Sequence, residues 1–257
     1  MQAMPRALIG FFFLVLTTLA FAQAQKAPAY EPQVGQEGKD VVWVPTPQAL
    51  VDKMLDMAKV TPKDVVIDLG SGDGRTVITA AKRGARAMGI EYNPNMVALA
   101  KRNAEQEGVA GRATFMKADL FESDFSEATV ITMFLLPEIN LKLRPKILGL
   151  KPGTRIVSNT FTMGDWKADQ TADPDGCDGS WCTAILWIVP AKAAGTWQTP
   201  HGELQLKQQF QMLSGTLRTK AGRTVPIQGK VLGEEVSFKA GGRDYRGRMN
   251  GSQLELR

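Results

Sequence analysis

The chain has 257 residues, of which 44% are hydrophobic and 22% are charged, and 31 Lys and Arg against 26 Asp and Glu give a net charge of +5. These values are ordinary for a globular protein and exclude intrinsic disorder and collagen-like repeats. Two cysteines are too few for a disulfide-rich scaffold. One histidine and two cysteines cannot fill four zinc positions without carboxylates, so we expect no metal site.

The first 24 residues have the pattern of an export signal. Arg6 precedes an uncharged apolar run over residues 7–20, and small residues follow at Ala22 and Ala24. A cation, a short apolar core and a small-x-small site are typical of a secretory signal peptide. We therefore expect residues 1–24 to be removed and the mature chain to be periplasmic or secreted. An uncleaved membrane anchor is the alternative.

Residues 25–40 contain Pro, Gly and Gln without periodicity and are predicted to form a tether. Strand and helix patterns then alternate over residues 41–190. Thr46 is expected to cap a helix over residues 48–58, and Pro145 is expected to break a later helix. The predicted strands are 65–69, 87–91, 113–119, 128–135 and 155–161, and the other predicted helices are 76–82, 95–107 and 138–150.

Such alternation predicts an α/β domain with a doubly wound, mostly parallel, Rossmann-like sheet. A mixed α+β domain without a shared ligand crevice is the alternative. After residue 162 the alternation stops: residues 163–181 are polar and predict a loop, and residues 182–190 predict a strand. From residue 195 hydrophobic residues recur at every second position, so residues 195–257 are predicted to form an antiparallel β module of about five strands.

The β module carries 10 Lys and Arg against 5 Asp and Glu, which is a net charge of +5. Arg243, Arg246 and Arg248 surround Tyr245 in its sequence. This basic character predicts either a solvated face or a weak contact with an anionic surface. We find no sequence-reading nucleic-acid motif, so no sequence-specific nucleic-acid partner is expected.

A glycine-rich loop, DLGSGDGR at residues 68–75, lies between the first predicted strand and the following helix. Such a loop lets the backbone approach a ligand at the helix N-terminus. The Gly-Lys-Ser/Thr of a Walker loop is absent, and Arg75 stands where a dinucleotide fingerprint needs its third glycine. The Asp68 carboxylate would repel a pyrophosphate but suits an ammonium or sulfonium, which favours S-adenosylmethionine over a nicotinamide cofactor.

Two further acids end the next two predicted strands. Glu91 stands where a carboxylate can bind ribose hydroxyls, and Asp119 can accept a hydrogen bond from an adenine amino group. Leu120 can pack on the adenine ring. Because ligands in this architecture bind at the carboxyl ends of the strands, the acids and the glycine loop predict one nucleoside-binding crevice.

The motifs DLGSGDGR, GIEYNP and KADLF resemble those of class I S-adenosylmethionine-dependent methyltransferases. VPTP, DLGSGDGR and FLLPEIN look most like bacterial relatives of the mitochondrial protein-lysine methyltransferases. The resemblance implies cofactor contacts from Asp68, Gly70, Gly72, Gly74, Glu91 and Asp119, to which Ser71 of the loop and Leu120 are added as candidates. It also implies that the substrate entrance is lined by Pro45 and Thr46 of VPTP and by Leu136, Pro137 and Glu138.

Methyl transfer is an in-line displacement that needs positioning more than a protein nucleophile. His201 lies outside the α/β domain, which disfavours His-assisted methylation of a hydroxyl group. We expect N-methylation of an amine such as a protein lysine, and Glu138 either orients this amine or complements a helix dipole. A nicotinamide-binding oxidoreductase and a non-catalytic exported protein that binds a ligand or partner are the alternatives.

Cys177 and Cys182 lie five positions apart in the Asp- and Gly-rich loop. In an exported protein they can close a small disulfide loop, and otherwise they are two separate thiols. Trp166 and Trp181 flank this stretch and form either an aromatic wall or part of the core.

The export signal and the cofactor point to different compartments, because S-adenosylmethionine is a cytosolic metabolite. Exogenous cofactor, an uncleaved anchor that keeps the enzyme at the inner face, or a domain without catalysis would each reconcile them. The position of Arg6 before the apolar run favours export.

Overall fold

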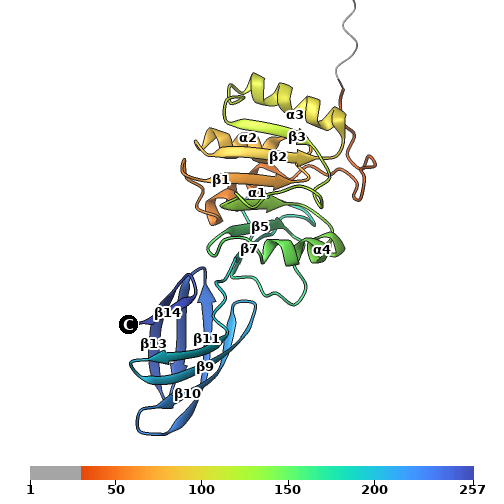
Figure 1. Ribbon diagram of the computed structural model, residues 1–257. Helices are drawn as coiled ribbons and strands as arrows, with labels where there is room; N and C mark the ends of the chain where they lie inside the picture. Colours follow the sequence, from red (N-terminus) through yellow and green to blue (C-terminus); the bar gives the residue numbers. More distant parts are fainter. Residues whose placement is uncertain (1–29) are drawn as a thin grey trace, which may run out of the picture. The chain divides into compact units, whose positions relative to one another are not determined.

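The computed structural model describes residues 30–257, so the predicted export signal over residues 1–24 lies outside the described residues (Figure 1). Within the described part, no helix combines the length and the apolar character needed to cross a membrane. Residues 32–257 form one compact unit.

The first sheet has seven strands, in the order β3-β2-β1-β4-β5-β7-β6 (Figure 1). Its strands are β1 (Val65–Leu69), β2 (Arg86–Glu91), β3 (Ala113–Lys117), β4 (Val130–Met133), β5 (Arg155–Asn159), β6 (Gln170–Ala172) and β7 (Ala184–Ile188). Strands β1 to β5 pair in parallel, whereas β7 pairs antiparallel with both β5 and β6. The predicted α/β fold with a mostly parallel sheet is therefore confirmed.

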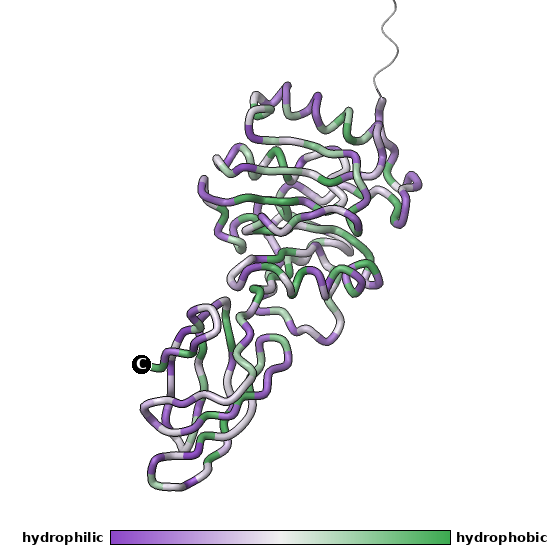
Figure 2. Tube along the Cα trace, in the orientation of Figure 1, coloured by the Kyte–Doolittle hydropathy of each residue, from purple (hydrophilic) through white to green (hydrophobic). Residues whose placement is uncertain are grey.

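Four helices cover the two faces of this sheet: α1 (Gln48–Met57), α2 (Arg75–Lys82), α3 (Pro94–Gln106) and α4 (Pro137–Ile147). Val66 belongs to the core cluster with α1, α2 and α3, whereas Ile67 belongs to the cluster with α4. Successive strand residues point to opposite faces, so a strand that is buried on both faces is hydrophobic throughout. In Figure 2 long hydrophobic stretches run along this sheet, whereas the strands near the C-terminus change colour at short intervals.

Two helix ends differ from their predictions. Pro47, not Thr46, occupies the N-cap position of α1, because the Thr46 hydroxyl instead accepts a hydrogen bond from Asn159 Nδ2 at 3.4 Å. Pro145 does not break α4, which continues to Ile147. Leu143 and Ile147 are buried on either side of the proline, so their packing holds the last turn in place. The helix predicted over residues 95–107 is α3, with Asn93 as its N-cap and Pro94 as its first residue.

The loop predicted over residues 163–181 contains one short strand, β6, so this prediction is wrong for Gln170–Ala172. The three residues of β6 are too few for an alternation of apolar and polar side chains to predict a strand. The strand is stabilised by its pairing with β7.

The C-terminal sheet has seven strands, not about five, and each pairs antiparallel with the next. They are β8 (Gly195–Thr199), β9 (Gly202–Gln209), β10 (Met212–Thr219), β11 (Thr224–Leu232), β12 (Glu235–Ala240), β13 (Arg243–Asn250) and β14 (Gln253–Leu256). The missed strands β8 and β13 carry few apolar residues, so alternation alone does not mark them. Phe210 lies in the turn between β9 and β10 with a φ of 51°. The end strands β14 and β8 also approach each other, which makes the sheet nearly a barrel.

The β module contacts the α/β domain at residues 166–169, and also at Arg144, whose guanidinium lies 5.1 Å from the centroid of the Phe210 ring. The Phe210 ring stacks on Trp166 with ring centroids 5.9 Å apart. Gln211, which is buried, donates a hydrogen bond from Nε2 to the Lys167 carbonyl at 2.6 Å, and Lys230 pairs with Asp169 at 3.2 Å. The module is thus joined to the loop that leads into β6 by an aromatic stack, a buried hydrogen bond and an ion pair.

Replacing Phe210 by alanine is expected to lower the free energy of unfolding by about 1–3 kcal/mol, because it removes a partly buried ring from the Trp166 stack. Urea denaturation followed by tryptophan fluorescence measures this change. Met212→Ala is the matched control: Met212 is an exposed apolar residue two positions further along, and its loss should cost less than about 0.5 kcal/mol. Equal costs for the two variants would contradict the assigned contact.

Candidate functional site

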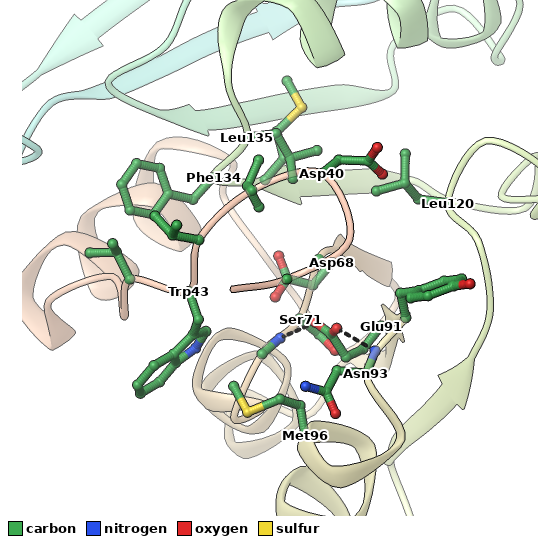
Figure 3. Close-up of a pocket in the computed structure, with 18 of the residues that line it drawn as sticks. Asp40, Trp43, Asp68, Ser71, Glu91, Asn93, Met96, Leu120, Phe134 and Leu135 are labelled. Carbon is green, nitrogen blue, oxygen red and sulfur yellow. Dashed lines mark hydrogen bonds between the residues drawn. The ribbon is translucent and has the colours of Figure 1, made fainter. Parts of the chain in front are cut away.

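A cavity opens at the carboxyl ends of the parallel strands (Figure 3). It is lined by the glycine loop after β1, by the residues that follow β2, β3 and β4, and by residues 36–46. The predicted candidates found in this lining are Asp68, Gly70, Ser71, Gly72, Glu91, Asp119, Leu120, Pro45, Thr46 and Leu136. The fold thus gathers in one place residues that lie far apart in the sequence.

The glycine loop needs its glycines for two different reasons. Gly72 has a φ of +52°, and a Cβ atom there would lie 2.7 Å from Trp43 Nε1, so a side chain would collide with the wall of the cavity. Gly74 does not line the cavity. It precedes α2 with a φ of +86°, and a Cβ atom there would meet the Phe115 ring at 2.7 Å, so this glycine serves the packing of α2 on the sheet.

Asp68 lies at the centre of the site and is only 6% exposed (Figure 3). Burial raises the pKa of its carboxyl group to about 7, against the effect of a hydrogen bond that Thr132 Oγ1 donates to it at 2.6 Å. The negative charges of Glu91 and Asp73 raise the pKa further. A buried acid in this setting is stabilised in its ionised form by a cation, so the site favours a positively charged ligand group.

Glu91, at the end of β2, orders the neighbouring backbone. Its two oxygens accept hydrogen bonds from Gly72 N at 3.0 Å and from Asn93 N at 2.8 Å, as the dashed lines in Figure 3 show. A carboxylate has about four lone-pair positions, so the remaining ones can accept hydroxyl groups of a ligand. Glu91 therefore connects the glycine loop to the start of α3 and still offers acceptors to a diol.

Asp119 follows β3 on another side of the cavity. Lys39 Nζ lies 2.5 Å from its carboxylate, and this hydrogen bond lowers the pKa of Asp119. The same ammonium lies 5.2 Å from the Tyr92 ring centroid and 5.9 Å from that of Phe121. Leu120 and Tyr92 line the cavity here, so this part offers apolar and aromatic side chains beside an acceptor.

One hydroxyl group of the glycine loop is buried without a partner. Ser71 is buried, and its Oγ has no hydrogen-bond partner among the described residues. A Cβ atom at Gly89 of β2 would lie 2.4 Å from this oxygen, so the hydroxyl group lies against β2 and is not presented to the cavity.

Residues 36–40, within the predicted tether, and the following residues 41–46 form part of the cavity wall. Backbone hydrogen bonds from Gly35 N to the Trp43 carbonyl, 2.8 Å, and from Trp43 N to the Gln36 carbonyl, 2.9 Å, close this segment into a loop. Lys39 and Trp43 were not predicted as site residues, since the stretch has no periodicity. A tryptophan and a lysine shortly before VPTP were the available signals.

The predicted substrate entrance is only partly in the lining. Pro45, Thr46 and Leu136 line the cavity, but Pro137 and Glu138 are exposed and lie outside it. They form the first turn of α4, where the Glu138 carboxylate complements the helix dipole. Thr46 is held in place through the Arg75 guanidinium, which donates to its carbonyl at 3.0 Å.

Cys177 and Cys182 form a disulfide bond, with Cα atoms 5.8 Å apart. Of the two flanking tryptophans, Trp166 is buried in the core, whereas Trp181 is exposed and lines the cavity. His201 is exposed in the turn between β8 and β9, where it contacts the Tyr245 ring. No group of three or more His, Cys, Asp or Glu among residues 30–257 is arranged to hold a metal ion.

The charge of the cavity lining is strongly acidic. Its carboxylates are Glu37, Asp40, Asp68, Asp73, Glu91 and Asp119, and its cations are Lys39 and Arg75. Both cations are already engaged, Lys39 with Asp119 and Arg75 with Asp73 at 2.6 Å. The cavity therefore attracts cationic groups and repels phosphates.

Comparisons with known proteins agree on one family. Residues 68–170 match the model of the ANTKMT methyltransferase domain. A protein-lysine N-methyltransferase of Saccharolobus islandicus is 50% identical over 153 residues, which cover 58% of this chain and 94% of that protein. A lysine N-methyltransferase of Homo sapiens, named for an ATP synthase subunit, is 33% identical over 166 residues, 59% of this chain and 70% of that protein.

A solved structure is similar as well. An RNA methyltransferase from Salinibacter ruber, in complex with S-adenosyl-L-homocysteine, is 49% identical with a TM-score of 0.55. The match covers 58% of this chain and 95% of that one. The relatives thus share the α/β domain, and their names differ in the acceptor they state.

Replacing Asp68 by asparagine is expected to stabilise the ligand-free protein at high pH. The pKa of about 7 in the folded state lies above the value of about 3.9 in an unfolded chain. Ionising Asp68 therefore costs folding stability progressively as the pH rises from 4 to 7, and the cost stays constant above that. At pH 8 Asp68→Asn should gain roughly 1–4 kcal/mol, and at pH 4 it should gain nothing.

Chemical denaturation at pH 4 and pH 8 tests this expectation. Asp244→Asn makes the same chemical change at an exposed ion pair in the β module and should alter stability by less than about 1 kcal/mol at either pH. A gain for Asp68→Asn that is the same at both pH values would show that Asp68 is not a buried acid with a raised pKa.

Proposed function

We propose that the chain methylates side-chain amines of lysine in a protein, because it belongs to the class I S-adenosylmethionine-dependent methyltransferases. Within this class it is related to the lysine N-methyltransferases named for an ATP synthase subunit and for the adenine nucleotide translocase. The family membership decides against the nicotinamide alternative. The observation that carries the lysine proposal is the acidic cavity, whose two cations are both paired with carboxylates.

The residues of the cavity fit the cofactor. The buried Asp68 can hold its cationic end, Glu91 its ribose hydroxyls, and Asp119 with Leu120 its adenine. When bound, the cofactor supplies a methyl group on a sulfonium, which an unprotonated amine can attack in line. The Trp43 indole and the Leu135 side chain pack against the glycine loop and exclude water from this side.

An amine fits the acceptor side better than RNA does. A polyanionic acceptor needs unpaired basic side chains to neutralise its phosphates, and the described lining offers none. In the basic β module, Lys230, Lys239 and Arg248 pair with carboxylates, whereas the other Lys and Arg side chains form no ion pair among the described residues. The preference for an amine over RNA therefore rests on the cavity lining alone. The lysine ammonium is attracted by the acidic cavity, whereas an RNA backbone is repelled from it.

The acceptor has to lose its proton before it reacts. The described cavity lining contains no histidine, and the chain's one histidine lies in the β module. The protein's contribution is therefore to orient the amine and to exclude water, and the proton leaves to solvent or to a carboxylate.

We also propose that the mature chain is exported. The signal-peptide pattern of residues 1–24 supports this, and so does the disulfide between Cys177 and Cys182, because disulfides persist in oxidising compartments and are rare in the cytosol. The methyl acceptor would then be an envelope or secreted protein.

Incubation of the purified protein with methyl-labelled S-adenosylmethionine and envelope extract should label a protein band. After acid hydrolysis the label should co-migrate with N-methylated lysine. Asp68→Ala should reduce the incorporation at least about tenfold, and Asp244→Asn, in the β module, should not change it. Label in the RNA fraction alone would exclude a lysine acceptor.

Amino-terminal sequencing of the protein from cell fractions tests export. The chain should begin at Gln23 or Gln25 and lie in the periplasmic or secreted fraction. Replacing Ala22 and Ala24 by aspartate should block cleavage and retain the longer chain. An intact Met1 in the cytosolic fraction would rule export out.

A further inference from the structure

Three aromatic side chains from separate segments converge at one end of the cavity. Phe134 directly follows β4, Phe161 follows β5, and Trp181 belongs to the loop before β7; all three line the cavity. The ring centroids of Phe134 and Phe161 are 5.8 Å apart, and those of Phe134 and Trp181 are 6.2 Å apart. In Figure 3 Phe134 lies across the cavity from Leu120 and Glu91. The cluster is therefore separate from the part that fits the adenosyl group.

This cluster is not a closed core. Trp181 is 45% exposed, whereas the core residues Trp166 and Trp187 are 1% and 0% exposed. Phe134 and Phe161 are partly buried. Large aromatic rings that are left open beside a cavity present their faces to a ligand, and the faces of aromatic rings carry negative potential.

A strained backbone conformation at Thr160 positions the Phe161 ring. Thr160 has a φ of 58°, which is rare for a β-branched residue. Hydrogen bonds from Thr160 N to the Thr183 carbonyl, 2.7 Å, and from Phe161 N to the Asn159 carbonyl, 2.6 Å, hold this conformation. The chain turns sharply after β5 and brings the Phe161 ring onto Phe134, and strain of this kind gathers at functional sites.

A disulfide restrains the third ring. Trp181 lies within the loop closed by Cys177 and Cys182, immediately before Cys182. Thr183, the next residue, is tied to Thr160 by the hydrogen bond to its carbonyl. Trp181 therefore sits between a covalent link and the strained turn that positions Phe161, which limits the places that its indole can reach.

The charges around the cluster suit a cation. Asp173, Asp175 and Asp178 are exposed on the same loop, and none of them makes an ion pair in the described chain. The cavity behind the rings is acidic as well. Aromatic faces that open on an acidic cavity are an arrangement that can bind alkylammonium groups.

We propose that Phe134, Phe161 and Trp181 form the binding site for the alkylammonium group of the methyl acceptor, and that the Cys177–Cys182 disulfide holds Trp181 in this site. The inference rests on the proposed function, in that it takes the acceptor to be an amine. It assigns acceptor recognition to the rings, and it makes this recognition depend on the oxidised state of the loop.

Choline and its uncharged isostere 3,3-dimethylbutan-1-ol test the site without turnover. The protein is labelled with 5-fluorotryptophan and saturated with S-adenosylhomocysteine, and the Trp181 fluorine resonance is identified by its loss in Trp181→Phe. Choline should shift this resonance saturably, and the isostere should bind at least about tenfold more weakly. Equal responses to the two compounds would overturn the proposal.

Calorimetric titration with choline compares the variants. Phe134→Ala and Trp181→Ala should weaken choline binding at least about fivefold, and Trp181→Phe should restore part of it. Trp197→Phe removes a tryptophan from β8 and is the matched control, with no expected change. The Trp181 variants should bind S-adenosylhomocysteine within about twofold of the wild type. A loss of that binding would overturn the assignment, because the ring would then support the cofactor.

The double variant Cys177→Ser, Cys182→Ser isolates the disulfide. Choline binding should fall to the level of Trp181→Ala while S-adenosylhomocysteine binding persists. Unchanged choline binding would overturn the role of the disulfide. Choline binding with no lysine labelling would contradict the proposed function but support the cation site. Lysine labelling with no choline binding would support the proposed function but contradict the cation site.

Discussion

A buried carboxylate at the end of the central strand is the constraint around which the rest of the site is built. Asp68 is held by β1 between two buried layers, and its hydrogen bond from Thr132 does not offset the loss of water. The glycine loop turns away immediately after it, and Glu91 orders that loop through Gly72. A cationic ligand group compensates for the burial of the Asp68 carboxylate. Asp68 therefore destabilises the ligand-free protein and at the same time favours binding of a cationic ligand.

Segments outside the shared α/β core complete the walls of the cavity. Residues 36–46 close one side, where Trp43 occupies space that a side chain at position 72 would need. Thr46 connects this segment to α2 through Arg75 and to β5 through Asn159. The loop before β7 supplies Trp181 on another side. The part that fits the cofactor is therefore built from the ends of β1, β2 and β3. The proposed acceptor site is built from the residues after β4 and β5 and from the loop before β7.

The β module has a structural connection to this acceptor side. Its contacts with residues 166–169 fix the start of the segment that carries β6 and then the disulfide loop. Gln211 satisfies a backbone carbonyl of that segment, and Lys230 neutralises Asp169, whose other oxygen accepts a hydrogen bond from Ile188 N at 2.9 Å. The ion pair thus joins the module to β7 as well. An attached β module in this place restrains a segment that would otherwise be a long loop.

The sequence by itself determined the α/β class, the glycine loop and the strand-end acids, because these depend on local pattern: continuous apolar strands, glycines at positive φ and acids directly after strands. Only the tertiary structure decided which of them share a cavity. Gly74 and Glu138 look like site residues in sequence but serve helix packing and a helix dipole, since their neighbours in space are Phe115 and solvent. No periodic pattern marks Lys39, Trp43 or Trp181 as site residues. Their positions are set by contacts with Asp119, Gly72 and Phe134, respectively. These partners lie 29 to 80 positions away in the chain, so no local sequence rule can pair them.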